Sequence, residues 1–285
     1  MSQIAESRYS TERDCIQNNG MSFFSHWRLR QLAADASVYV TEKFGVRSLH
    51  IGSDTIQSSM RLARPHDLEL AYTRSMMAFL LFNERPQRVL MVGLGGGSLA
   101  KFVYHRLPEA VAEVLEINPQ VVAVARRLFE VPAADARLIV RVCDGAEFMA
   151  RDGPGYDTIL VDGYDGESQV EELSSRAFYD ACRRRLEHRG MLVVNLWGSD
   201  RRFGDYLGRI EAAFPSGTLC LPAEKPGNVI VLAFRDPPGD LRWDELERRA
   251  RELEASYGLE FGKFTGGLRK MNRCDDRLLY LSGES

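Results

Sequence analysis

Residues 88–118 restrict the possible folds of this chain more than any other stretch. An apolar run, Val89–Val92, leads into four glycines, and a second apolar run ends at Glu116. The four glycines are Gly93, Gly95, Gly96 and Gly97. This order predicts a nucleotide-binding βαβ unit, because residues without Cβ let a ligand approach the main chain where a strand meets the next helix. Glu116, roughly twenty residues further on, is suited to hold a ribose diol. An ordinary tight turn is the alternative interpretation of the glycines.

The spacing after the glycines disfavours NAD, because Ser98 stands where the dinucleotide fingerprint has its third glycine. Two further acids end apolar runs: Asp144 follows a third expected strand and Asp162 a fourth. The carboxyl ends of parallel strands meet at one ligand-binding crevice, where Asp144 can accept a hydrogen bond from an exocyclic amine such as that of adenine. Each acid has an alternative role as a helix N-cap or turn residue.

Seven apolar runs that alternate with helical patterns predict an α/β fold with a doubly wound, mostly parallel, seven-stranded sheet. The expected strands are at about 88–93, 111–117, 138–143, 157–162, 191–196, 217–221 and 228–235. Only turn residues separate the last two, which predicts an antiparallel hairpin. A helix over 69–82 is expected to pack against the sheet.

The chain divides into four expected parts. Residues 1–36 form a tail or docking segment, 37–66 a small N-terminal β-domain, 67–240 the Rossmann-like nucleoside-binding catalytic domain, and 241–285 a C-terminal helical extension. Within the extension, an amphipathic helix is expected to pack on the body of the domain. The segment FGKFTGGLRKMN after it is expected to be a lid or a terminal loop.

The sequence resembles the polyamine aminopropyltransferases, of which spermidine synthase is the familiar member. Residues 39–77 resemble the family's small β-domain and the helix that leaves it, and DGYDG at 162–166 resembles its Asp-Ser-Ser-Asp-Pro signature. The resemblance implies a methyltransferase-like Rossmann core and a homodimer formed through the β-domain. It also implies that the co-substrate is decarboxylated S-adenosylmethionine, or S-adenosylmethionine itself.

The resemblance assigns two groups of site residues. The nucleoside group consists of Gly93, Gly95, Gly96, Gly97, Ser98, Glu116 for the ribose, and Asp144 with Gly145 on the adenine side. The amine group consists of Gln57, Tyr72, Asp162 as the acid that receives the amine's proton, and Asp165 as the second acid.

Departures from the family pattern gather where the amine and the donor's tail are expected. Ser98 replaces the usual aspartate. After Tyr72 the family has histidine or glutamine followed by glutamate, whereas this chain has Thr73 and Arg74. A late tyrosine is missing from LPAEKPGN. An aspartate beside the donor's tail attracts an ammonium and repels a carboxylate. Ser98 therefore predicts weaker discrimination against intact S-adenosylmethionine. An Arg74 that faces the site would repel a cationic acceptor.

The expected function is transfer of an aminopropyl group from decarboxylated S-adenosylmethionine to an amine, in polyamine biosynthesis. The attacking amine must be neutral, which costs roughly 4 kcal/mol at neutral pH for an alkylamine. Asp162 is the expected base. A methyltransferase that uses S-adenosylmethionine is the first alternative, and a nucleoside-binding protein without turnover is the second.

Composition bounds the partners and the location. A net charge of -3 provides no basic footprint, so nucleic acid is not an expected partner. Five scattered cysteines without a CxxC pair predict reduced thiols and no metal site. No apolar run approaches the roughly twenty residues of a membrane span, and the polar start lacks a signal-peptide core. A cytoplasmic protein that does not contact membranes is expected.

Overall fold

The structure is a computed structural model that describes residues 37–163, 170–223 and 227–281. The expected N-terminal tail, the candidate acid Asp165, and Glu224 and Lys225 lie outside the described residues.

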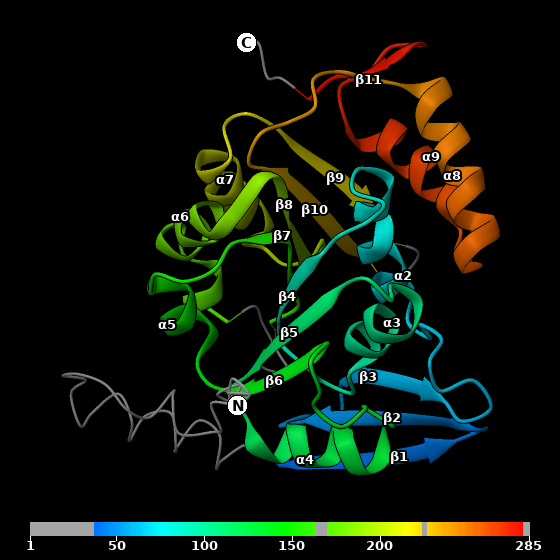
Figure 1. The fold of residues 1–285 in the computed structure, drawn as a ribbon, viewed down its shortest axis with the longest axis vertical. Coiled ribbons are helices and arrows are strands. Elements are labelled where there is room, and N and C mark those ends of the chain that lie inside the picture. Colours follow the sequence, from blue (N-terminus) through cyan, green and yellow to red (C-terminus); the bar gives the residue numbers. More distant parts are fainter. Residues whose placement is uncertain (1–36, 164–169, 224–226, 282–285) are drawn as a thin grey trace, which may run out of the picture.

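A seven-stranded sheet with the order β6-β5-β4-β7-β8-β10-β9 forms the centre of the molecule (Figure 1). Its strands are β4 (Arg88–Val92), β5 (Val111–Glu116), β6 (Leu138–Val142), β7 (Tyr156–Val161), β8 (Leu186–Trp197), β9 (Thr218–Pro222) and β10 (Asn228–Phe234). Strands β4 to β8 run parallel, whereas β10 is antiparallel to both β8 and β9. The predicted doubly wound sheet and its terminal hairpin are confirmed.

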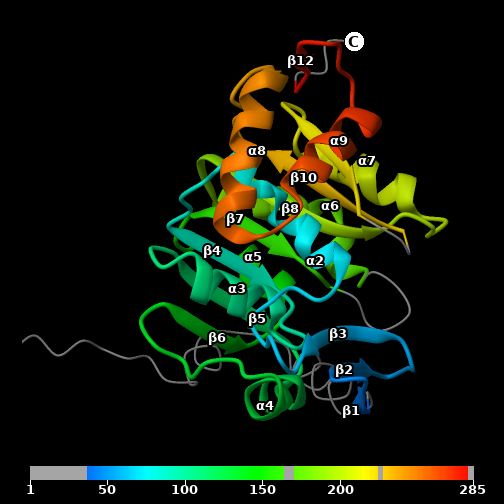
Figure 2. The same ribbon diagram turned by 90° about the vertical axis from the view of Figure 1, so that its right-hand side faces the viewer.

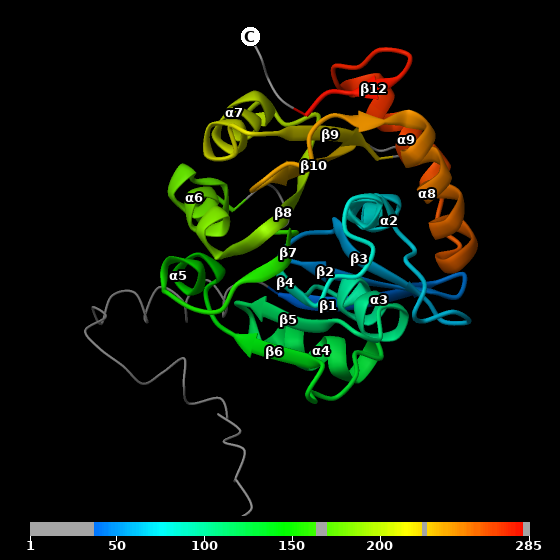
Figure 3. The same ribbon diagram turned by 45° about the horizontal axis from the view of Figure 1, so that its top comes forward.

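Helices cover both faces of this sheet (Figures 2 and 3). One face packs against α2 (Ala71–Met76), the 3-10 helix η1 (Met77–Leu81), α3 (Ser98–Arg106), α8 (Trp243–Tyr257) and α9 (Phe261–Met271). The other face packs against α5 (Gly145–Ala150), α6 (Arg176–Arg185) and α7 (Phe203–Ala213). A short 3-10 turn, η2 (Glu172–Ser174), precedes α6, and the two-residue strands β11 (Leu241–Arg242) and β12 (Leu278–Leu279) pair near the end of the chain.

A separate antiparallel sheet precedes this core, as the sequence predicts. It contains β1 (Val38–Lys43), β2 (Val46–Ile51) and β3 (Ile56–Arg61). It packs against α4 (Pro119–Leu128) through a small apolar cluster. The buried members of that cluster are Leu49, Met60, Val121 and Phe129. This packing brings β3 next to the glycine loop.

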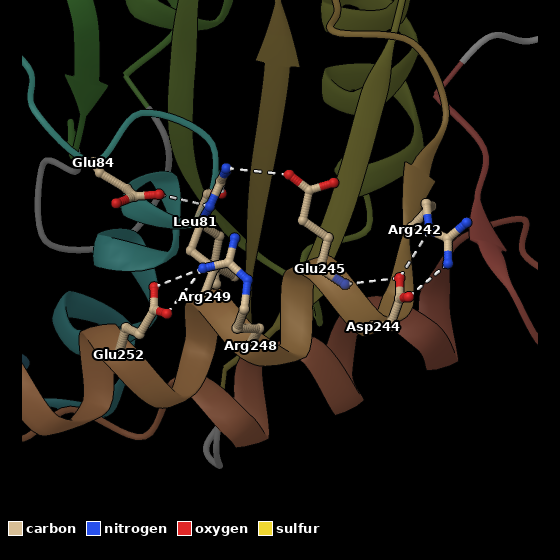
Figure 4. Close-up of polar contacts among 8 residues, drawn as sticks. All are labelled: Leu81, Glu84, Arg242, Asp244, Glu245, Arg248, Arg249 and Glu252. Carbon is tan, nitrogen blue, oxygen red and sulfur yellow. Dashed lines mark hydrogen bonds and ion pairs between the residues drawn. The ribbon is translucent and has the colours of Figure 1, made fainter.

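The single helix expected over 69–82 is interrupted: α2 ends at Met76 and η1 continues to Leu81. All five side chains of η1 are buried, so the segment has no solvent-facing side, unlike an amphipathic α-helix. Figure 4 shows how α8 contacts the end of η1. The Arg249 guanidinium donates to the backbone oxygen of Leu81 at 2.5 Å, and its Nε lies 2.7 Å from a Glu84 carboxylate oxygen.

The segment that begins at Phe261 is a helix, α9, which packs on β9 and α8, so the sequence-based expectation of a terminal loop is wrong. Phe261, Phe264 and Leu268 have helical spacing and are buried, which outweighs the low helix propensity of the glycines. Gly267 packs so closely that a Cβ there would lie 2.6 Å from Leu221 of β9. The amphipathic helix before it, α8, packs on the domain as predicted.

Lys101 of α3 is a buried cation, with a relative exposure of only 1%. Its Nζ donates to the backbone oxygens of Pro65 and Phe129, each at 2.7 Å, and so ties α3 to the segment after β3 and to the end of α4. Burial lowers the pKa of Lys101 from 10.5 to about 8, although the charge of Glu130 opposes the shift. The ammonium is therefore costly to keep charged in the folded state.

This burial predicts an unusual pH dependence of stability. Between pH 8 and 10.5 the unfolded chain still holds the Lys101 proton that the folded protein has released, so the contribution of Lys101 to the free energy of unfolding should rise with pH, by up to about 3 kcal/mol. Urea unfolding at pH 7, 8, 9 and 10 measures it. Lys101→Met should remove this rise, whereas Lys270→Met at an exposed position of α9 should keep it. Equal pH dependence in wild type and Lys101→Met would contradict the prediction.

In the part of the chain that the structure describes, we find no helix long and apolar enough to cross a membrane and no group of side chains arranged to hold a metal ion.

Candidate active site

The glycine loop lies where the strand order of the sheet reverses. β4 and β7 are parallel neighbours there, and the Asp162 backbone N–H donates to the Val92 oxygen at 3.0 Å. Gly93 has a φ of +101°, and a Cβ at this position would overlap the backbone oxygen of Asp162. Only glycine allows the two strand ends to approach so closely. Ligands of doubly wound sheets bind at such a switch point.

Asp162 is held as a half-buried carboxylate between two side-chain donors. Asn195 Nδ2 of β8 donates to its Oδ1 at 2.9 Å, and the Tyr72 hydroxyl of α2 donates to its Oδ2 at 3.1 Å. Burial raises the pKa of Asp162, while the hydrogen bonds from Asn195 and Tyr72 oppose that rise. Each oxygen has one neutral donor, so the remaining lone pairs can accept a proton.

Gln57 and Tyr72 meet beside this carboxylate. The Tyr72 hydroxyl lies 3.3 Å from the backbone oxygen of Gln57, which belongs to β3. The Tyr72 hydroxyl thus contacts both β3 of the small sheet and Asp162. The contact made by Gln57 is through its main chain, and the substrate-binding role of its side chain stays a prediction.

Glu116 binds the main chain of the glycine loop. Its Oε2 accepts the Leu94 N–H at 3.0 Å and its Oε1 accepts the Asn118 N–H at 2.9 Å. Burial raises its pKa, and hydrogen bonds from the backbone of Asn118, Leu94, Gly95 and Ile117 oppose the rise. Glu116 therefore fixes the shape of the loop. Its role toward a ribose stays a prediction.

Asp144 is the N-cap of α5, which is the alternative role that the sequence left open. Its Oδ1 accepts the backbone N–H groups of Ala146 at 2.7 Å and Glu147 at 3.1 Å. Gly145 packs under β4, because a Cβ there would lie 2.6 Å from Val92. Both residues follow β6, two strands away from β4, as the sequence predicts.

Ser98 begins α3 and is buried. Its hydroxyl lies 3.3 Å from that of Ser58 on β3, and either group can donate. Ser58 also fills the space beside the loop, since a Cβ on Gly96 would lie 2.7 Å from the Ser58 oxygen. Neutral hydroxyls therefore stand where the family resemblance placed an aspartate.

Arg74 does not point toward Asp162. Its guanidinium pairs with the Glu260 carboxylate at 3.2 Å and donates to the backbone oxygens of Leu68 and Glu69. Tyr72 and Arg74 thus leave α2 in different directions. Arg74 is therefore not placed to repel a cationic acceptor at Asp162.

Known proteins resemble this chain over most of its length. Residues 69–196 match the family described as the spermine/spermidine synthase domain. The polyamine aminopropyltransferase of Chromobacterium violaceum is 44% identical over 236 residues, which is 83% of this chain and 90% of that protein. The chain belongs to the spermine/spermidine synthase family. A second member, from Neisseria meningitidis serogroup A, is 42% identical and is matched over 93% of its length.

Solved structures agree with this family fold. A probable spermidine synthase from Corynebacterium glutamicum superposes with a TM-score of 0.66, covering 84% of this chain and 93% of that chain, at 20% identity. Human methyltransferase-like protein 13, solved in complex with SAH, superposes with a TM-score of 0.60 at 27% identity and covers 73% of this chain and 96% of its own. The spermine/spermidine synthase fold is thus shared with a methyltransferase.

Three residues of this family member's site escaped the sequence analysis. They are Ser58, Asn195 and Asn228. Asn195 had a signal, because it is the single polar residue inside the apolar run LVVNLW. Ser58 and Asn228 had none, because a serine near a strand end and an asparagine after a turn are common surface residues.

Proposed function

We propose that this chain transfers an aminopropyl group from decarboxylated S-adenosylmethionine to an amine, with Asp162 as the base. The observation that carries the proposal is the half-buried Asp162 carboxylate, held by Tyr72 and Asn195 at the switch point next to the glycine loop. Membership of a family of polyamine aminopropyltransferases supports the same reaction.

The reaction needs only a base and correct placement of two substrates. The lone pair of the amine forms a bond to the carbon next to the sulfonium, the C–S bond breaks, and sulfur keeps the pair as a neutral thioether. The proton that leaves the nitrogen passes to Asp162. A base of this kind contributes on the order of a hundredfold to ten-thousandfold, and in-line placement supplies much of the remainder.

The glycine loop, Ser98, Glu116 and the turn at Asp144 and Gly145 form the proposed site for the nucleoside of the donor. Glu116 fixes the loop through Leu94 and the turn after β5 through Asn118. Structural relatives bound to SAH or to the transition-state analogue AdoDATO support a nucleoside of the S-adenosylmethionine class.

A second candidate function is methyl transfer from intact S-adenosylmethionine. The observation that favours it is the Ser58–Ser98 pair, which has no negative charge to repel the carboxylate of that donor. The similarity to human methyltransferase-like protein 13 supports it as well.

Calorimetric titration with each donor, followed by mass analysis of products formed with putrescine, tests both functions. We expect turnover that adds an aminopropyl group, and tighter binding of the decarboxylated donor after Ser98→Asp, since the new carboxylate attracts an ammonium. Methylated product without aminopropylated product would favour the second candidate. Binding of either donor without any product would contradict both.

We further propose a homodimer in the cytoplasm. Exposed apolar side chains on the small sheet, Phe44 at 89% and Ile56 at 50%, support pairing through this sheet. Analytical ultracentrifugation tests it, and a species with the mass of one 32.2 kDa chain at micromolar concentration would contradict the dimer.

A further inference from the structure

Two asparagine side chains form a continuous line of hydrogen bonds that ends at Asp162. Asn228 Nδ2, at the start of β10, donates to Asn195 Oδ1 at 2.9 Å. Asn195 Nδ2 in turn donates to Asp162 Oδ1 at 2.9 Å. The three residues come from β10, β8 and β7, which are consecutive in the sheet. Asn195 is buried at 2% exposure, whereas Asp162 and Asn228 at the two ends of the line are half-buried.

The two bonds together determine which way the Asn195 amide faces. A terminal amide can present either its oxygen or its NH₂ group to a neighbour. The Asp162 carboxylate only accepts, so it pairs with the Asn195 NH₂ group, and the Asn195 oxygen is left to accept the hydrogen bond from Asn228. With the opposite orientation, an amide oxygen would face a carboxylate oxygen, and two acceptors in a buried place repel each other.

We propose that Asn195 and Asn228 are positioning residues for the base: Asn228 fixes the Asn195 amide, and Asn195 fixes the Asp162 carboxylate against the attacking amine. This inference rests on the proposed role of Asp162 as base. Asn195 is the direct holder, and Asn228 acts only through it. Tyr72 holds the other carboxylate oxygen, so Asp162 is oriented from two sides.

The line of bonds also sets the proton affinity of the base. The Asn195 hydrogen bond counteracts the rise in the pKa of Asp162 that burial causes. A neutral donor stabilises the carboxylate form and keeps it available for the amine's proton at neutral pH. When Asn228 no longer holds the Asn195 amide, the pKa of Asp162 should rise further.

Two substitutions of Asn228 separate this role from simple packing. Asn228→Ala removes the donor, and we expect kcat to fall about tenfold. Asn228→Asp keeps the shape, but the introduced carboxylate only accepts. The Asn195 NH₂ group then lies between two competing carboxylates and the Asn195 oxygen faces an acceptor, so kcat should fall about a hundredfold. A packing role predicts the reverse order, because the isosteric change would be the milder one.

The pH profile and the Michaelis constants provide further readouts. In both variants the acid limb of kcat/KM should move up by about half a pH unit or more, while KM for the donor stays within about twofold. The matched control is Asn272→Ala, which removes amide hydrogen bonds to the main chain of Cys220 on neighbouring β9, at 2.7 Å each. It should change stability without moving the pH profile.

A carboxyl-carbon NMR titration of Asp162, assigned by comparison with Asp162→Asn, reads the same effect without turnover. We expect a higher pKa in Asn228→Ala than in wild type. This readout separates the two proposals, because it tests the asparagines even if no aminopropyl transfer is observed. The inference is overturned if the pKa of Asp162 is unchanged in Asn228→Ala, or if Asn228→Asp is milder than Asn228→Ala.

Discussion

Asp162→Asn should lower kcat for aminopropyl transfer by a hundredfold to ten-thousandfold, on the order expected for loss of a positioned base. The amide cannot take the amine's proton, but it keeps the size of the carboxylate, so the donor's dissociation constant should stay within about threefold. Steady-state kinetics with a diamine and calorimetry with the donor measure the two quantities.

The pH dependence of the wild type gives a second test of Asp162. The base must be ionised, and burial raises its pKa, so kcat/KM should fall on acidification at a higher pH than for an ordinary aspartate. The matched control is Asp157→Asn at the opposite end of β7, whose carboxylate accepts the backbone N–H groups of Gln87 and Arg88 at 2.7 Å. It should affect stability only. Loss of donor binding in Asp162→Asn would contradict the assigned role.

Gly93→Ala should be strongly damaging, because the added methyl group would meet main chain and not a side chain that can move. The new Cβ would overlap the Asp162 backbone oxygen, and the φ of +101° is strained for any other residue. We expect the free energy of unfolding to fall by about 3 kcal/mol or more. We also expect kcat to fall at least tenfold, because the strand end that carries Asp162 must move.

Urea unfolding and steady-state kinetics measure the two effects of Gly93→Ala. Gly204→Ala in α7 is the matched control, since a Cβ there meets no atom within 4 Å, and it should be neutral or stabilising. A midpoint of unfolding for Gly93→Ala equal to that of wild type would contradict the expected overlap.

The sheet was predictable because its strands are long apolar runs with clear ends. The strand after Gly190 was expected to begin at 191, yet β8 begins at Leu186. Charged residues at 187–189 disguise this part of the strand, and a register shift next to Tyr156 accommodates it. Helix α9 was missed because its glycines have a low helix propensity, and the local sequence gives no sign that this is overcome. Close packing against β9 stabilises the helix.

The sequence patterns predicted only those site residues that lie at the ends of strands. The glycine loop, Glu116 and Asp162 belong to strand ends that sequence patterns reveal. Asp162 is held by Tyr72 of α2, which the family resemblance indicated, and by Asn195 of β8, which Asn228 of β10 holds in turn. No spacing rule links residues 72, 195 and 228. The direction of Arg74 was equally hidden, because its partner Glu260 lies 186 positions later in the chain.

The ion pair between Arg74 and Glu260 has a consequence for how such enzymes diverge. It fastens the helix that bears Tyr72 to the turn between α8 and α9, and Arg249 fastens the following η1 to α8. Displacements of an ångström or less alter rates strongly when a base and a nucleophile must align. Substitutions in the C-terminal helices can therefore retune acceptor preference while every residue that touches a substrate stays the same. Comparisons of relatives that consider only substrate-lining positions would overlook this route of specialisation.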